Sequence, residues 1–115
     1  WAALESDLDA QSELIRDDRV MITSKRWPNQ ADNLMVQKER RAANLSRDPD
    51  LKIIATISSP EVRIYGKVAI ADFVRRYDFI PGMGEMSPPN FTYITLVLVE
   101  EDGNWEIAHT HNSSM

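Results

Sequence analysis

The last third of the chain contains two stretches typical of β-strands, an almost continuous apolar run at residues 93–99 and a more polar segment at residues 105–111. They flank Asp102-Gly103, a dipeptide that favours a tight hairpin turn. The pattern therefore predicts a β-hairpin here. On its second strand, we expect one face to carry Trp105, Ile107, His109 and His111.

The length of the hairpin loop decides which residues lie opposite the two histidines. A two-residue turn would place them opposite Leu96 and Ile94. A three-residue loop with a bulge at Gly103 would place them opposite Thr95 and Tyr93 instead. Both alternatives keep the histidines on the face that carries the apolar residues of their strand. Such a face suits the floor of a pocket.

A second hairpin is predicted upstream of the first. Residues 51–65 are rich in β-branched side chains, and Pro60 within them indicates an edge position or a kink. Gly66-Lys67 favours a two-residue turn that sends residues 68–79 back antiparallel. Residues 80–90 contain too many Pro and Gly residues for a strand and predict a loop.

Helical spacing dominates the first half of the chain. It predicts a short helix that starts near Ser6 and stops at Asp17-Asp18, then a short strand at residues 20–23. The longest helix is expected between Asn29 and Asp48-Pro49. Its recurring positions are Ala31, Leu34, Met35, Lys38, Ala42 and Leu45. Helices followed by long antiparallel strands are typical of the α+β class, with helices on one face of a curved sheet.

Length and composition limit the alternatives. At 115 residues and 43% hydrophobic content, residues 1–115 are expected to form a single domain. The absence of cysteine excludes disulfides, thiolate nucleophiles and Cys-ligated metals. The net charge of −5 argues against a nucleic-acid partner. No apolar stretch approaches the roughly 20 residues of a membrane span, and the first residues do not resemble a signal peptide. We therefore expect a cytoplasmic protein without a membrane partner.

Several segments resemble the SnoaL-like branch of the nuclear transport factor 2-like superfamily, which has a cystatin-like α+β fold. The resemblance covers nearly the whole chain and is carried by residues 1–5, 7–10, 62–70 and 102–113. The last segment also resembles the end of the association domain of calcium/calmodulin-dependent protein kinases. The resemblance implies a conical α+β barrel, in which a strongly bent antiparallel sheet and N-terminal helices surround a long helix. It also implies a cavity at the open end and, often, a homodimer.

His109 and His111 are candidates for general acid/base catalysis, because imidazole changes its charge near neutral pH. The alternative is a pair of structural imidazoles that form hydrogen bonds within the core. His-x-His also matches the start of the cupin metal motif, but one face of one strand supplies too few ligands. We therefore expect no metal, and no Gly-rich phosphate loop indicates a cofactor.

Arg76 and Asp78 should point the same way from their strand, with Asp72 further along that face. Their spacing resembles the Arg-x-Asp of the limonene-epoxide-hydrolase-like branch of the superfamily, where the pair serves acid/base chemistry. The aspartate that this branch carries on its last strand is absent, because residues 108–110 are Ala, His and Thr. The alternative is an ion pair at a strand end, which contributes little.

Large aromatic residues suggest a ligand pocket for a hydrophobic small molecule, although they commonly form the core. The predicted pocket residues are Trp27, Asp72, Tyr77, Tyr93 and Trp105.

The sequence leaves two alternative functions. The first is a cofactor-independent acid/base enzyme, an isomerase, a dehydratase or an epoxide hydrolase, in which His109, His111, Asp78 and Arg76 act on that molecule. The second is a non-catalytic module of the same fold that binds a ligand or forms a dimer. The fold alone does not choose between them, because the superfamily contains both enzymes and non-catalytic members.

Overall fold

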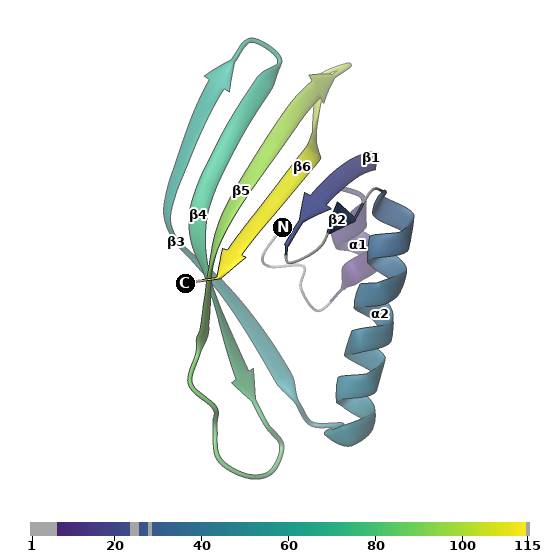
Figure 1. The fold of residues 1–115 in the computed structure, drawn as a ribbon, viewed down its shortest axis with the longest axis vertical. Coiled ribbons are helices and arrows are strands. Elements are labelled where there is room, and N and C mark those ends of the chain that lie inside the picture. Colours follow the sequence, from purple (N-terminus) through teal and green to yellow (C-terminus); the bar gives the residue numbers. More distant parts are fainter. Residues whose placement is uncertain (1–6, 24–25, 28, 115) are drawn as a thin grey trace.

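The part of the chain that the structure describes folds into one curved β-sheet with two helices (Figure 1). The computed structural model describes residues 7–23, 26–27 and 29–114, without the side chains of Trp27 and Asp32. The elements in chain order are α1 (Leu8–Ser12), β1 (Ile15–Ile22), β2 (Arg26–Trp27), α2 (Gln30–Arg47), β3 (Lys52–Tyr65), β4 (Val68–Ile80), β5 (Asn90–Glu101) and β6 (Asn104–Ser114). The predicted α+β class is confirmed.

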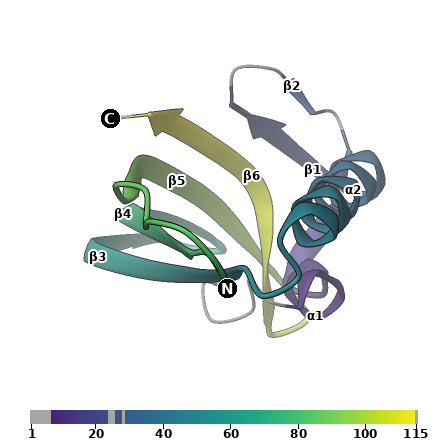
Figure 2. The same cartoon turned by 90° about the horizontal axis from the view of Figure 1, so that it is seen from below.

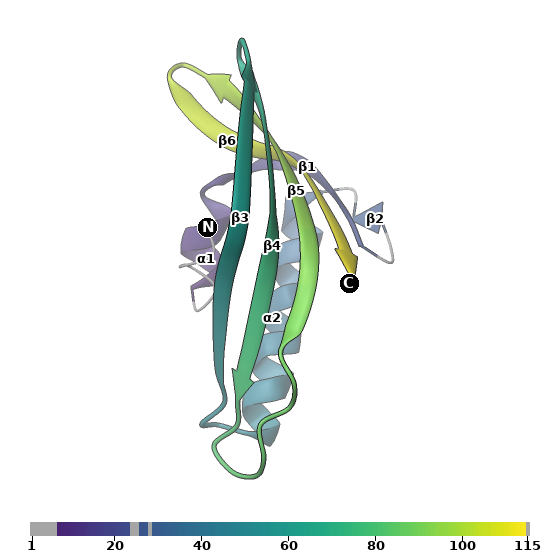
Figure 3. The ribbon, with the colours of Figure 1, turned by 90° about the vertical axis from the view of Figure 1, so that its left-hand side faces the viewer.

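The strands are ordered β2-β1-β6-β5-β4-β3, and neighbouring strands are antiparallel except for the parallel pair of β1 and β6. The sheet bends around the side on which α1 and α2 lie, and neither of these helices covers its convex face (Figure 2). Seen from the left-hand side of Figure 1, β3 and β4 run together as a long hairpin with α2 behind them (Figure 3). The described sheet is strongly curved but open, with β2 and β3 as its edges.

The long helix lies where the sequence predicts it, but its predicted stripe does not face the sheet. It ends before Pro49, and the amide of Asp48 still donates to the carbonyl of Asn44 at 2.9 Å. Met35 and Leu45 remain 55% and 46% exposed, whereas Asn33 is buried. The polar face of α2 therefore turns toward the concave side of the sheet. This polar face of α2 lines a cavity on the concave side of the sheet, where it does not pack against an apolar core.

The first helix is shorter than predicted, and β1 begins earlier. Asp7 caps α1 by accepting a hydrogen bond from the amide of Ala10 at 3.1 Å, and the helix ends at Ser12. Ile15 then starts a strand, because it is buried against β6 instead of continuing a helical turn. The predicted cap, Ser6, lies outside the described residues.

Two strands each contain one extra residue relative to the partner strand. On β3, the register with β4 shifts between Ser58 and Glu61, where Pro60 indicates a kink. On β6, Asp102-Gly103 forms a two-residue turn, but the register with β5 shifts at Ala108. A bulge of this kind turns every later side chain to the opposite face. Neither predicted hairpin register is therefore correct beyond this residue.

The apolar core occupies the middle of the concave face. It consists of Ile15, Phe73, Ile94, Leu96 and Ile107, with Ala71 and Leu98 packed against it. These side chains come from β1, β4, β5 and β6, so they hold the bent part of the sheet together. Neither described helix is both long and apolar enough to cross a membrane.

Candidate functional site

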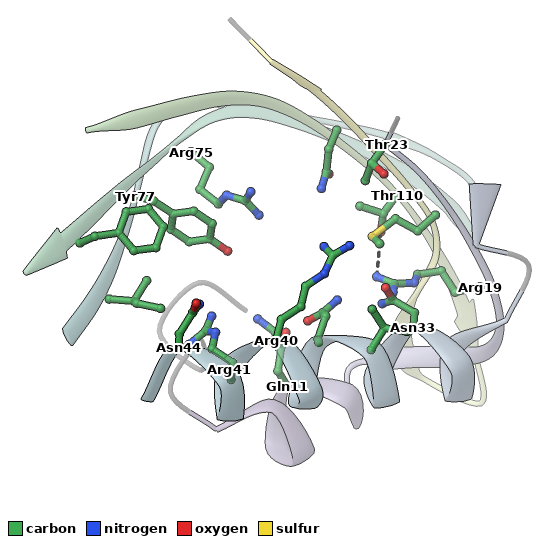
Figure 4. Close-up of a pocket in the computed structure, with 16 residues that line it drawn as sticks. Gln11, Arg19, Thr23, Asn33, Arg40, Arg41, Asn44, Arg75, Tyr77 and Thr110 are labelled. Atoms are coloured by element: carbon green, nitrogen blue, oxygen red, sulfur yellow. Dashed lines mark hydrogen bonds between the residues drawn. The ribbon is translucent and has the colours of Figure 1, made fainter. Parts of the chain in front are cut away.

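A cavity of about 330 Å³ lies between α2 and the concave face of the sheet (Figure 4). Two strands and the helix supply most of its lining. Alternate residues of β1 and β4 point into it because side chains on a strand alternate between faces. These strand residues are Arg19, Met21, Arg75, Tyr77 and Phe79, and Thr23 follows directly after β1.

The helix contributes an inward face that is mostly polar. Asn33, Gln37, Arg40, Arg41 and Asn44 recur three or four residues apart and line the cavity. Two residues of β6, Thr110 and Asn112, complete the opposite wall. The cavity is thus bordered by amides, hydroxyls and guanidinium groups as well as by the aromatic rings of β4.

The described lining residues carry positive charge and no negative charge. Four arginines, Arg19, Arg40, Arg41 and Arg75, border the cavity, and no Asp or Glu occurs among the described residues that line it. Charges of one sign in a concave site bounded by protein raise the local concentration of ions of the opposite sign. The cavity is therefore electrostatically suited to an anion.

Arg19 is the most unusual of these arginines. Its residue is only 2% exposed, and its Nη1 donates to Oγ1 of the buried Thr110 at 3.2 Å. Its Nε and Nη2 are buried without a hydrogen-bond partner among the described residues. Burial lowers the pKa of Arg19 to about 10, so the guanidinium is still charged at neutral pH. Buried charges are normally paired, because an unpaired one loses its hydration without compensation.

The polar groups around Arg19 add to this arrangement. Asn33 lies at the same end of the cavity as Arg19 and Thr110 (Figure 4). Its buried Nδ2 also has no hydrogen-bond partner among the described residues. Native proteins leave few buried polar groups unsatisfied, and such groups commonly mark a ligand or ion. Three unpaired donor atoms on two neighbouring side chains make this end a candidate contact for anionic oxygens.

The other end of the cavity is aromatic. The guanidinium carbon of Arg75 lies 3.9 Å from the ring centroid of Tyr77, a cation–π contact. Tyr77 in turn meets Phe79 edge to face, with ring centroids 5.8 Å apart. Figure 4 places Arg75 and Tyr77 across the cavity from Arg19. The cavity therefore has aromatic side chains and a second guanidinium at a distance from its buried cation.

The two histidines lie on the convex face, away from this cavity. His109 is opposite Val97 and His111 is opposite Thr95, whereas the cavity residues Thr110 and Asn112 are opposite Leu96 and Ile94. The predicted face shared with Trp105 and Ile107 is wrong, because the bulge at Ala108 separates them. No other described residues join the histidines in a group of three His, Asp or Glu that could hold a metal ion.

Arg76 and Asp78 do form the expected ion pair. The Nε of Arg76 lies 3.0 Å from Oδ2 of Asp78, and its Nη2 donates to Oδ1 at 3.0 Å. Both residues share the convex face with Asp72, which is exposed and lies opposite Thr95. Asp72 and His111 flank Thr95 on its two sides, two strand spacings or about 9.6 Å apart. The structure thus places all four proposed catalytic residues on one face, but not in one contact group.

The predicted pocket residues are scattered. Tyr77 lines the cavity, whereas Tyr93 and Asp72 are exposed on the convex face. Trp105 is 39% exposed near the tip of the last hairpin, which does not fit the core position considered for it. The side chain of Trp27 lies outside the described residues.

The arginines of the cavity are absent from the sequence-based candidates. In the sequence, these arginines occur within two regular patterns. Arg19 and Met21 alternate along β1, with Thr23 just after its end, and the polar residues of α2 recur at helical spacing. Either pattern is also typical of a solvated surface, so the chemistry becomes visible only when the two elements are placed face to face.

Comparisons with known proteins agree with this architecture. The model of the SnoaL-like domain family matches residues 1–115. No curated protein sequence matches the chain. Among solved structures, the β subunit of the benzoate 1,2-dioxygenase from Burkholderia mallei is 18% identical, with a TM-score of 0.79 over 99% of this chain and 83% of that one.

Two further structures show the same fold. The CamKII hub homology domain from Chlamydomonas reinhardtii is 17% identical, with a TM-score of 0.78 over 99% of this chain and 88% of that one. An NTF2-like protein with a cystatin-like fold from Novosphingobium aromaticivorans is 14% identical, with a TM-score of 0.78 over 99% of this chain and 74% of that one. The chain therefore belongs to the SnoaL-like domain family, and its fold is that of the NTF2-like proteins.

Proposed function

We propose that this SnoaL-like domain binds a small organic anion in the cavity between α2 and the sheet, with Arg19 as its main contact. The observation that carries the proposal is the buried guanidinium of Arg19, whose Nε and Nη2 have no partner among the described residues. A ligand carboxylate would accept hydrogen bonds from both atoms in the bidentate geometry that guanidinium groups favour. The aromatic end of the cavity favours an organic anion over an inorganic ion.

The lining favours binding over acid/base catalysis. No His, Asp or Glu occurs among the described residues that border the cavity. A general acid or base must lie within hydrogen-bond reach of the reacting group. The catalytic role considered for His109, His111, Asp78 and Arg76 stays a prediction, and it requires a substrate on the convex face.

Calorimetry with benzoate and hexanoate tests the proposal. Hydrogen bonds to charged groups contribute about 1.5–3 kcal/mol each. Replacing Arg19 with Gln should therefore weaken binding at least about tenfold. Arg63→Gln is the matched control, because Arg63 is an exposed arginine of β3 that faces Glu61 at 3.7 Å. Equal affinities of the wild type and Arg19→Gln would contradict the assignment, as would the absence of any carboxylate binding.

A second proposal concerns the convex face, which neither described helix covers. Tyr93 is 53% exposed at its centre, and Phe91 beside it is also exposed. A positive and a negative side chain lie near these two aromatic residues, because Arg76 is opposite Phe91 and Asp72 is opposite Thr95 on the neighbouring strand. We infer that two copies pair through this face, because a two-fold interface requires a self-complementary surface. Sedimentation should then show a dimer that Tyr93→Glu dissociates, while Met35→Glu on α2 leaves it intact. A monomer at all concentrations would contradict this.

A further inference from the structure

A second hollow adjoins the cationic cavity and has a different lining. It measures about 590 Å³ and lies among α1, α2 and the start of β3. Its apolar residues are Leu8, Leu45, Leu51, Ile53 and Ile54. Charged groups also border it, among them the ion pair between Lys38 and Asp9, with Nζ and Oδ1 2.6 Å apart. This hollow therefore combines an apolar surface with charged groups.

The two spaces share part of their walls. Arg41, Asn44 and Ile53 border both of them. In Figure 4, Arg41 and Asn44 lie at the end of the cationic cavity away from Arg19. A molecule that extends from Arg19 past these two residues of α2 therefore reaches the apolar hollow.

The helix gives the length of this path. Asn33 lies beside Arg19, and Leu45 borders the second hollow twelve residues later on α2. At 1.5 Å per residue, the two positions are about 18 Å apart along the helix axis. One small carboxylate cannot span this distance, whereas an extended hydrocarbon chain of about fourteen carbons can, at about 1.25 Å per carbon–carbon bond.

We propose that the ligand is an amphipathic carboxylate of the fatty-acid type, an inference that rests on the proposed anion-binding function. Its carboxylate binds Arg19, and its hydrocarbon chain passes Arg41 and Asn44 into the hollow formed by Leu8, Leu45 and Leu51. Burial of each methylene group contributes about 0.8 kcal/mol, which corresponds to about a fourfold gain in affinity. The affinity should therefore increase with chain length until the hollow is filled.

Calorimetry with hexanoate, decanoate and tetradecanoate below their micellar concentrations tests this. Wild-type affinity should increase about fourfold per methylene. Leu45→Gln should flatten this increase and leave hexanoate affinity within about twofold of wild type. Gln keeps a good helix former at this half-exposed position. Met35→Gln, at the exposed Met35 of the same helix, is the matched control and should keep the full dependence on length.

The outcomes separate this inference from the proposed function. Binding of hexanoate that requires Arg19 but does not strengthen with chain length would overturn the amphipathic ligand and leave the anion site standing. Tetradecanoate binding that responds to Leu45→Gln but not to Arg19→Gln would overturn the proposed orientation. If no carboxylate of any length binds, both proposals fail.

Discussion

Replacing Arg19 with Met should stabilise the ligand-free protein while removing its capacity to bind anions. Met has a similar length and carries no charge, so the substitution removes a buried guanidinium whose Nε and Nη2 have no partner among the described residues. Replacing buried ionic groups with apolar residues of similar volume is often neutral or stabilising. A residue kept at the expense of stability is the expected signature of a binding site.

The size of the effect follows from the burial of Arg19. Burial lowers its pKa to about 10, which corresponds to about 3 kcal/mol against the charged form. Because the folded-state pKa lies below the unfolded one, this cost is fully present at neutral pH and diminishes only as the pH rises through about 10. Loss of the hydrogen bond from the charged Arg19 guanidinium to Thr110 subtracts about 2 kcal/mol. The net gain is about 1 kcal/mol, which would raise the unfolding midpoint by roughly 4 °C.

Urea unfolding, followed by tryptophan fluorescence and circular dichroism, measures this difference. The wild type and Arg19→Met are first unfolded and refolded to remove any bound anion, and the two proteins are then compared at the same concentration. Arg63→Met on the exposed part of β3 should change the free energy of unfolding by less than about 0.5 kcal/mol. If Arg19→Met is instead less stable than the wild type by 1 kcal/mol or more, Arg19 is paired within the protein and the binding argument fails.

Three further substitutions test other parts of the structure. Thr110→Val removes the hydroxyl that accepts a hydrogen bond from Nη1 of Arg19 and should lower the free energy of unfolding in urea by about 1–3 kcal/mol. The control Thr95→Val should change this free energy little. Equal losses in the two variants would contradict the contact between Arg19 and Thr110. Gly82→Ala would place a Cβ 2.4 Å from Cβ of Asp50 and should cost about 1–3 kcal/mol, so an unchanged thermal midpoint would refute this close approach. Deletion of Ala108 should strongly destabilise the protein, because residues 109–114 would exchange faces; native-like stability would show that the bulge is dispensable.

The parts of the fold that local chemistry encodes were predictable. Asn29 and Asp48-Pro49 limit α2 correctly, and Asp102-Gly103 forms the expected two-residue turn. The bulge at Ala108 was not predictable, because alanine neither requires nor forbids an extra residue in a strand. The ion pair of Arg76 and Asp78 follows from their spacing on one strand.

The candidate site was hidden for a different reason. A buried arginine such as Arg19 has the same local sequence pattern as an exposed one, because its burial depends on what packs over it. The direction in which α2 faces was misjudged for the same reason. Its apolar residues Met35 and Leu45 do not line the cationic cavity and remain about half-exposed, whereas its polar positions do line that cavity. Amphipathic spacing alone assumes that the apolar face is the inner one.

The bulge on β6 also makes the chain convenient for magnetic resonance. The sequence contains two histidines, and both project from the convex face, while the adjacent Thr110 lines the cavity. The imidazole signals of His109 and His111 should therefore shift when two copies pair through that face. They should stay in place when an anion enters the cavity behind them. One proton spectrum can thus distinguish assembly from ligand uptake without any added label.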